Sequence, residues 1–473
     1  MRFKRKFFIV LTLLRHSVLL PFSFLIFLFL PLNIPETGRL QKITDYSIPQ
    51  NPQPKHLPPY VLVKPRDQDY RPNSKTPIER LKSSQDLSKI REMQFTGNLD
   101  RSYFNKKKFK HINDSMRRII MMIIQFEEIS RRRFNRGTES LPTQVDLEGL
   151  ADHIIDSRWY REVIKRFSSN KAYGFSEERL LRVLMSIQVA ANSFEVPYPS
   201  LFCLFFQESK FDFLANSATG AKGIGQLTSI GLEEVRRLRN SSKMETKLQR
   251  TANHLNQVYT DPQIQKWLAN LGFKINFAKI SPIPEEVKFT RITSAFMREV
   301  GKELVKEGQS YGENTSLLWL LSKKLRRGHI LYGNHAHMHK VFSQMLEKEY
   351  ASSQASAYNS ETNILLSTIL FNHYYRYQWR NNKQVFDIPL EARVILASSA
   401  YNHGQTGVRR FLINLKNEFP LLDFQKLSSQ KLKILFTTRR LSNALQGPSQ
   451  KTLEASRHVR KIMDCAEKRP KFS

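Results

Sequence analysis

One acidic side chain lies where a buried helix meets a glycine-rich loop, and it is the strongest candidate for proton transfer in this chain. Glu208 follows the run at 201–206, which is apolar on every side, as is typical of a buried helix. Pro199 suits the first turn of that helix, because proline there loses no helical hydrogen bond. A carboxyl group packed against apolar side chains loses hydration, which favours its protonated form. The sequence therefore predicts that Glu208 is a general acid.

The loop after this helix carries the polar side chains best suited to hold a substrate. Ser217 and Gln226 are these candidates, although Ser217 taken alone also fits a cap. Gly220, Gly223 and Gly225 would let the loop backbone approach a ligand closely.

A second polar group occurs far along the chain. Tyr401 and Asn402 precede His403 and Gly404, on a helix that we expect to start at Pro389. Gly404 is predicted to end that helix as a left-handed cap. Taken alone, Tyr401 also fits a core position, and Asn402 with Gly404 fits an ordinary helix end.

These motifs, in this order, resemble those of the soluble lytic transglycosylases and the related goose-type lysozymes, which cut peptidoglycan. The matching residues are Glu208-Ser209-x-Phe211, Ser217-x-x-Gly220-Ala221-x-Gly223, Gln226-Leu227, Glu361-Thr362-Asn363-Ile364 and Ala400-Tyr401-Asn402-His403-Gly404, with a weaker likeness at 452–462. The chain departs from the family at Gly225 and Thr228, where Met is common, and at His403, where Ala is common.

The resemblance implies a mainly α, lysozyme-like fold and cleavage of the β-1,4 bond between N-acetylmuramic acid and N-acetylglucosamine. The reaction it implies consumes no water and leaves 1,6-anhydro ends. Glu208 would be the single acid and base, and the Tyr401 hydroxyl would lie near its carboxyl. The residues that would bind the glycan are Ser217, Gln226, Asn402 and Gly223. The resemblance implies no metal and no cofactor.

Two alternatives stay open. Glycoside hydrolysis by the usual route needs two carboxylates that flank the bond, as in a lysozyme-type hydrolase. No Asp or Glu occurs between 217 and 230, and we expect Asp212 to lie on the surface where the helix ends. A single acid suffices if the 6-hydroxyl of the substrate is the nucleophile. The other alternative is a catalytically silent protein that binds the cell wall.

The N-terminus predicts export. Basic residues precede the apolar stretch at 17–34, which is typical of a signal peptide or an uncleaved membrane anchor. The stretch is at the lower edge of the roughly 17–25 residues that span a bilayer, and we favour the anchor. The flanking charge predicts that the rest of the chain lies across the cytoplasmic membrane, in the cell envelope or periplasm.

The domain organisation follows from composition and from the resemblance. Residues 1–35 are the signal or anchor, and 36–110 are a proline-rich, basic linker. The predicted lysozyme-like domain has two pieces, 171–240 and 359–465. An accessory helical segment covers 111–170, and a helical insertion of unknown role covers 241–358. The insertion is expected to contain helices around 284–307, 317–326 and 341–350. In the accessory segment, a helix at 112–126 should pack on the body.

Three further features bear on partners. The net charge of +33 favours polyanions in general, and export makes wall glycan a better partner than nucleic acid. His335, His337 and His339 have zinc-like spacing, but a solvated helix start fits them better because no Cys or carboxylate stands beside them. Cys203 is interpreted as a small buried residue; a bridge to Cys465 is open but has no support in the sequence.

Overall fold

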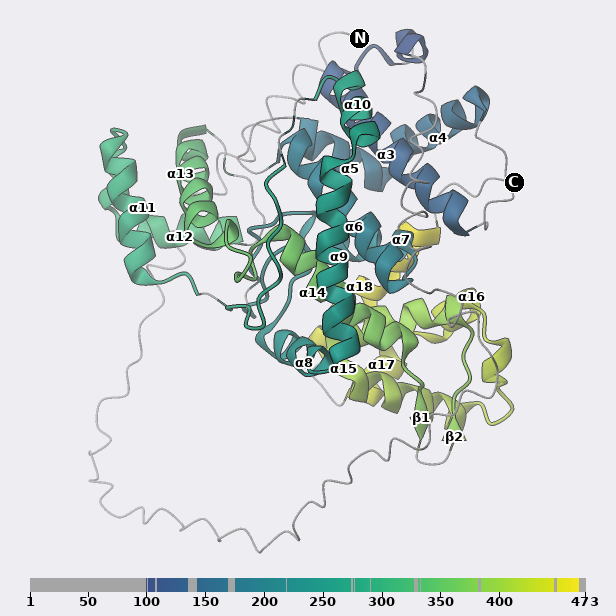
Figure 1. The fold of residues 1–473 in the computed structure, drawn as a ribbon. Coiled ribbons are helices and arrows are strands. Elements are labelled where there is room, and N and C mark those ends of the chain that lie inside the picture. Colours follow the sequence, from purple (N-terminus) through teal and green to yellow (C-terminus); the bar gives the residue numbers. More distant parts are fainter. Residues whose placement is uncertain are drawn as a thin grey trace, which may run out of the picture. The chain divides into compact units, whose positions relative to one another are not determined.

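The computed structural model of the 473-residue chain is almost entirely helical (Figure 1). It describes residues 99, 101–106, 109–134, 143–168, 175–217, 219–273, 275, 277–289, 291–326, 331, 333–381, 384–445 and 449–467. The mainly α class is confirmed. The signal or anchor at 1–35 and nearly all of the linker at 36–110 lie outside these residues. In the part that is described, no helix has the length and apolar character needed to cross a membrane.

The accessory segment forms three helices after a short 3-10 turn, η2 (Arg101–Asn105). They are α3 (Asp114–Phe134), α4 (Gln144–Asp156) and α5 (Arg158–Ser168). α3 packs against α4, α5 and α6, and Ile119, Ile120, Ile123 and Ile124 on it are buried. The predicted helix that packs on the body is therefore confirmed.

The helices that carry the predicted site residues lie in two stretches of the chain. α6 (Glu177–Phe194) and α7 (Tyr198–Ser209) come first. α14 (Ser360–Arg376), α15 (Leu390–Glu418) and α18 (Ser449–Glu467) come later. α14 packs on both α6 and α15, while α7 packs on α6 and α18 (Figure 1).

The starts of α6 and α7 follow local rules of helix capping. Ser176 caps α6 by accepting a hydrogen bond from the backbone N–H of Arg179, as is common at helix N-termini. α7 begins without a side-chain cap and has Pro199 in its first turn. Its residues at 200–206 are all buried, so the predicted buried helix is confirmed.

Gly404 separates two helices that together make up α15. Its φ of 74° and ψ of 163° are not helical, and the second helix continues to Glu418. This region of backbone space is open almost only to glycine. The predicted helix end at Gly404 is therefore confirmed, but its ψ is not that of a left-handed cap.

After α15 the chain forms short helical elements before it reaches α18. They are η7 (Phe424–Lys426), α16 (Ser429–Leu435) and α17 (Thr438–Leu445). β1 (Arg380–Asn381) and β2 (Gln384–Val385) make a two-stranded antiparallel hairpin between α14 and α15, pairing Arg380 with Val385.

The predicted insertion contains two groups of helices. α8 (Ser229–Arg239) precedes it; α9 (Ser242–Thr260) packs on α6, and α10 (Pro262–Asn270) packs on α9. α11 (Ser294–Lys306), α12 (Thr315–Arg326) and α13 (Ala336–Leu346) pack mainly on one another. The short turns are η4 (Ser310–Glu313), η5 (Gly333–His335) and the π-helix η6 (Glu347–Ala351). The sequence did not predict α9 or α10, and it placed the start of α11 ten residues too early.

The backbone closes the base of the α11–α13 group. Lys288 and Ser356 form a parallel bridge, in which Lys288 N donates to Ala355 O at 2.5 Å and Ala357 N donates to Lys288 O at 3.2 Å. The chain therefore leaves for α11 and returns after η6 at the same place.

Candidate active site

Glu208 lies in the last turn of α7, and its side chain is only 10% exposed. Its Oε1 is 3.0 Å from Nε2 of His458, a residue of α18 whose side chain is 17% exposed. The two atoms are not aligned as a hydrogen bond, and neither makes one elsewhere among the described residues. The structure thus places a carboxyl and an imidazole in direct contact.

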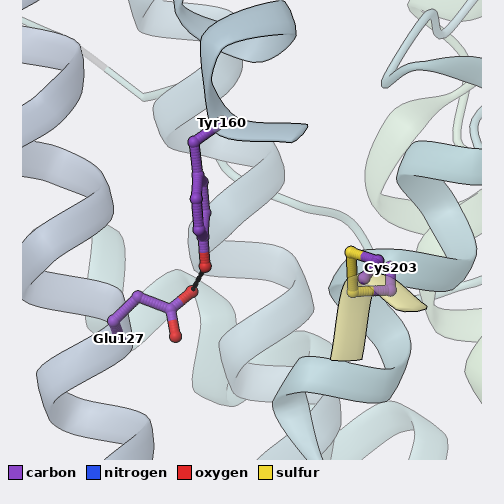
Figure 2. Close-up of a disulfide and its surroundings, with 4 residues drawn as sticks. Glu127, Tyr160 and Cys203 are labelled. Atoms are coloured by element: carbon purple, nitrogen blue, oxygen red, sulfur yellow. Dashed lines mark hydrogen bonds between the residues drawn. A yellow bond between two sulfur atoms is a disulfide. The ribbon is translucent and has the colours of Figure 1, made fainter. Parts of the chain in front are cut away.

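A disulfide joins the same two helices. Cys203 of α7 and Cys465 of α18 are bonded, with their Cα atoms 5.8 Å apart (Figure 2). The interpretation of Cys203 as an unbonded buried residue was wrong. The partners are 262 residues apart in sequence, and only the packing of α18 against α7 brings them together.

The hydroxyl of Tyr401 reaches the glycine-rich loop. It donates a 2.6 Å hydrogen bond to the Gly225 carbonyl. Burial, and then the negative charge of Glu208, raise the pKa of the Tyr401 hydroxyl. Tyr401 therefore lies within electrostatic reach of the carboxyl and remains protonated at neutral pH.

Asn363 of α14 holds the loop in place from beneath. It is fully buried, its Oδ1 accepts from Gly225 N at 2.7 Å, and its Nδ2 donates to the carbonyls of Lys222 at 3.0 Å and Ala357 at 2.7 Å. The Asn-Ile motif pointed to this residue but predicted no role for it.

Two glycines permit this close contact with α14. A Cβ on Gly225 would lie 2.1 Å from Ser367 Oγ and 2.7 Å from Ser367 Cβ. A Cβ on Gly223, whose φ is 71°, would lie 2.5 Å from Asn363 Nδ2. The structure gives these glycines a steric reason: they let the loop backbone approach a helix, which is a different need from approach to a glycan.

The predicted glycan-binding side chains mainly contact their own loop or helix. Ser217 Oγ accepts from Ala221 N at 2.9 Å and is paired with Thr219. Gln226 Nε2 donates to the carbonyls of Ala215 at 3.1 Å and Gly223 at 2.9 Å. These contacts stabilise the loop conformation.

Asn402 is on the exposed side of α15. Its Nδ2 donates to Ser398 O at 3.3 Å, one helical turn back. Its role in glycan binding stays a prediction, as do those of Ser217, Gln226 and Gly223.

A second histidine faces the same region from α15. Burial lowers the pKa of His403 to about 4, and the charge on His458 is a smaller cause. Its Nε2 is buried and makes no hydrogen bond within the described part of the chain. The sequence showed His403 as a departure from the family, whereas His458 lies in the stretch at 452–462, where the likeness to the family is weaker, and was not predicted to belong to the site.

Asp212 is buried, contrary to the prediction of a surface position. Its Oδ1 accepts from Leu214 N at 3.0 Å, and burial raises its pKa to about 6. After α7 the chain turns inward, since Lys210 and Phe211 have φ values of 58° and 61° and Phe211 is buried. The carboxylate is therefore held by the backbone of its own turn.

No family model matches this chain, and neither a curated protein nor a solved structure matches it. The likeness to lytic transglycosylases therefore rests on the sequence motifs alone.

Basic side chains gather beside the end of α7. The pKa of Lys210 is lowered, mainly by burial and also by the positive charges of Lys461, Arg166 and Arg158. Lys210 Nζ also lies 4.1 Å from the centre of the Phe206 ring. The acidic Glu162 opposes this shift, so the groups around Lys210 are of mixed charge.

The three histidines of the insertion are not alike. His337 Nε2 pairs with Glu307, whereas His339 is buried and burial lowers its pKa to about 4. The predicted solvated helix start is therefore wrong for His339. In the described ranges, no three His, Cys, Asp or Glu side chains are grouped so that they could hold a metal ion.

Proposed function

We propose that this protein is a peptidoglycan lytic transglycosylase whose lysozyme-like domain is formed by 171–240 and 359–465. The observation that carries the proposal is the arrangement around Glu208. Its carboxyl ends a buried helix, and Tyr401, within its electrostatic reach, is hydrogen-bonded to the glycine-rich loop.

In the proposed reaction Glu208 acts twice. Its protonated carboxyl donates to the oxygen that joins N-acetylmuramic acid to N-acetylglucosamine, while the bond from that oxygen to C1 breaks. The carboxylate then takes the proton of the 6-hydroxyl, whose oxygen bonds to C1 and closes the 1,6-anhydro ring. Atoms balance without water, and Glu208 ends protonated as it began.

The surroundings support one acid over two. The stretch at 217–230 contains no Asp or Glu, and the buried Asp212 already accepts a hydrogen bond from its own turn. A retaining hydrolase would need a second carboxyl about 5–5.5 Å from the first. This favours a lyase over a lysozyme-type hydrolase.

The disulfide and the charge support a location in the cell envelope. Disulfides persist in oxidising compartments such as the bacterial periplasm. The Cys203–Cys465 disulfide therefore favours a location in such a compartment. The segment at 1–35 would export or anchor the chain, and the net charge of +33 would attract anionic wall polymer. We therefore propose glycan strands as the partner, with no cofactor.

The test is digestion of purified sacculi by the detergent-solubilised full chain, with mass analysis of the released fragments. We expect 1,6-anhydro ends from the parent and a rate at least about 100-fold lower from Glu208→Gln. Glu178→Gln, which changes an exposed acid at the start of α6, is the matched control and should keep the parental rate.

Other outcomes identify the alternatives. Reducing ends in place of anhydro ends would show a hydrolase. Binding to sacculi by both the parent and Glu208→Gln, with no fragments from either, would show a silent wall-binding protein. Either result overturns the proposal.

A further inference from the structure

We infer that His458 positions the Glu208 carboxyl for its reaction, and that the Cys203–Cys465 disulfide holds His458 in place. This role rests on the proposed function, but the placement behind it can be tested without any activity. The observation is the juxtaposition of Glu208 Oε1 and His458 Nε2 at 3.0 Å between two helices joined by a disulfide.

The contact engages one oxygen of the carboxyl. Oε1 is buried and lies 3.0 Å from His458 Nε2, without a hydrogen bond between them. A carboxyl group that is fixed through one oxygen presents the other in a defined direction. His458 thereby orients the oxygen that would exchange a proton with the glycan, since small misplacements of a reacting group cost large factors in rate.

The disulfide acts on both members of this pair. Cys203 lies five residues before Glu208 on α7, and Cys465 lies seven residues after His458 on α18. Each separation is between one and two turns of helix, so the bond fixes the register of α18 against α7 close to the contact. Figure 2 shows the bond beside α7.

The other titratable groups beside this pair are neutral. His403 on α15 is buried and, with a pKa of about 4, is neutral at neutral pH. Tyr401 stays protonated because burial and Glu208 raise its pKa. His458 is the imidazole whose contact with the Glu208 carboxyl the structure shows.

The first experiment measures the rate at which a water-soluble carbodiimide and an amine label Glu208 in the full chain, by peptide mass spectrometry. His458→Ala uncovers Oε1, and Cys203→Ser/Cys465→Ser releases α18, so we expect at least about tenfold faster labelling in both. His458→Gln keeps an N–H near the same place and should label at the parental rate, as should Glu454→Gln, an exposed acid on α18.

Each result decides one part of the inference. Parental labelling in His458→Ala overturns the placement, and parental labelling in the disulfide-free variant overturns the role of the bond. Circular dichroism of each variant checks that it is folded, and His458→Gln tests the contact if His458→Ala is not.

The second experiment separates kcat from KM for release of anhydro fragments. His458→Ala should lower kcat by about 100-fold and change KM less than twofold, and His458→Gln should restore most of the loss. Adding His458→Ala to the disulfide-free variant should cause no further loss, because both changes remove the same contact. Equal kcat in the parent and His458→Ala overturns the inference and leaves the proposed function intact. If the parent releases no anhydro fragments, the proposed function fails, and the labelling rates alone decide whether His458 holds Glu208.

Discussion

Two helical regions of this chain differ in how many polar side chains they bury, since the α11–α13 group buries only Ser322, His339 and Ser343 among its described residues. α14 buries a run of them, and the exposed fractions of Glu361, Thr362, Asn363, Ser367 and Thr368 are all 2% or less. In the α11–α13 group the ion pairs lie on the surface, as with Glu299–Lys302 and Glu303–Lys306, which are one turn apart on α11. Both regions are helical and have apolar cores, so helix formation alone does not explain the contrast.

The contrast shows which region is built to position other groups. A buried polar group destabilises a fold unless it is hydrogen-bonded. Asn363 meets this condition by bonding the backbone of the glycine-rich loop, and Glu361 meets it with Arg182 and Tyr259. The polar interior of α14 therefore fixes the loop that Tyr401 contacts, whereas the surface pairs of α11 fix nothing beyond their own helix.

The largest expected effect on the free energy of unfolding comes from replacing Asn363. Asn363→Ala removes the side-chain partner of Gly225 N and of the Ala357 carbonyl, and one of the two hydrogen bonds to the Lys222 carbonyl. We expect a loss of about 4 kcal/mol in the free energy of unfolding. Asn314→Ala is the matched change in the second region, where Asn314 only caps α12; it should cost about 1 kcal/mol. Urea unfolding measures both, and equal losses would contradict the contrast.

The same substitution, glycine to alanine, can be compared at two crowded positions. Gly225→Ala places Cβ against Ser367, and Gly301→Ala places Cβ 2.6 Å from the Gly312 carbonyl. Each should cost about 2–3 kcal/mol. Only Gly225→Ala should also abolish release of anhydro fragments, since it displaces the loop. Gly149→Ala, which has open space in α4, is the control; activity loss in Gly301→Ala would show that the insertion shapes the site.

Replacing Asp212 is expected to increase the stability of the fold in a pH-dependent way. Its pKa rises from 3.8 to about 6 on folding, so the folded state favours the neutral acid. That stabilisation is complete below pH 3.8 and is lost as the pH rises through about 6. Asp212→Asn should therefore be more stable than the parent by about 1–3 kcal/mol at pH 7.5, with the difference disappearing near pH 4. Thermal unfolding across this range measures it, and a gain that does not vary with pH would contradict the assignment.

The smallest effect is expected at the exposed pair on α11. Glu299→Gln removes a surface contact with Lys302, and surface ion pairs contribute little because water and salt screen them. We expect no measurable change in the unfolding midpoint or in fragment release. A clear loss in either would show that this surface has a partner or a role that its contacts do not reveal.

Local patterns in the sequence predicted the elements near Glu208 well. The all-round apolar run of α7 and the apolar stripe on α3 each depend on neighbours in sequence. α10 was also readable, since Asp261 caps it and Pro262 opens it. These signals act within a few turns of the chain, which is why sequence patterns carry them.

The groups that complete the candidate site depend on distant packing. His458 and Cys465 reach α7 only through the docking of α18, and nothing near them in sequence indicates it. Asp212 was predicted to be exposed because a helix end usually is; two consecutive residues with positive φ turn it inward. Asn363 was noticed as a motif, but its three loop contacts required the structure.

The bridge between Lys288 and Ser356 gives the α11–α13 group a property of its own. Its two chain ends are hydrogen-bonded side by side, and Glu347 of η6 pairs with Arg179 of α6 close to the same end of the group. Chains tolerate inserted units best where the entering and leaving strands are close together. A unit of another length or fold could be inserted between these two segments. The hydrogen bond between Gly225 and Asn363 would be kept.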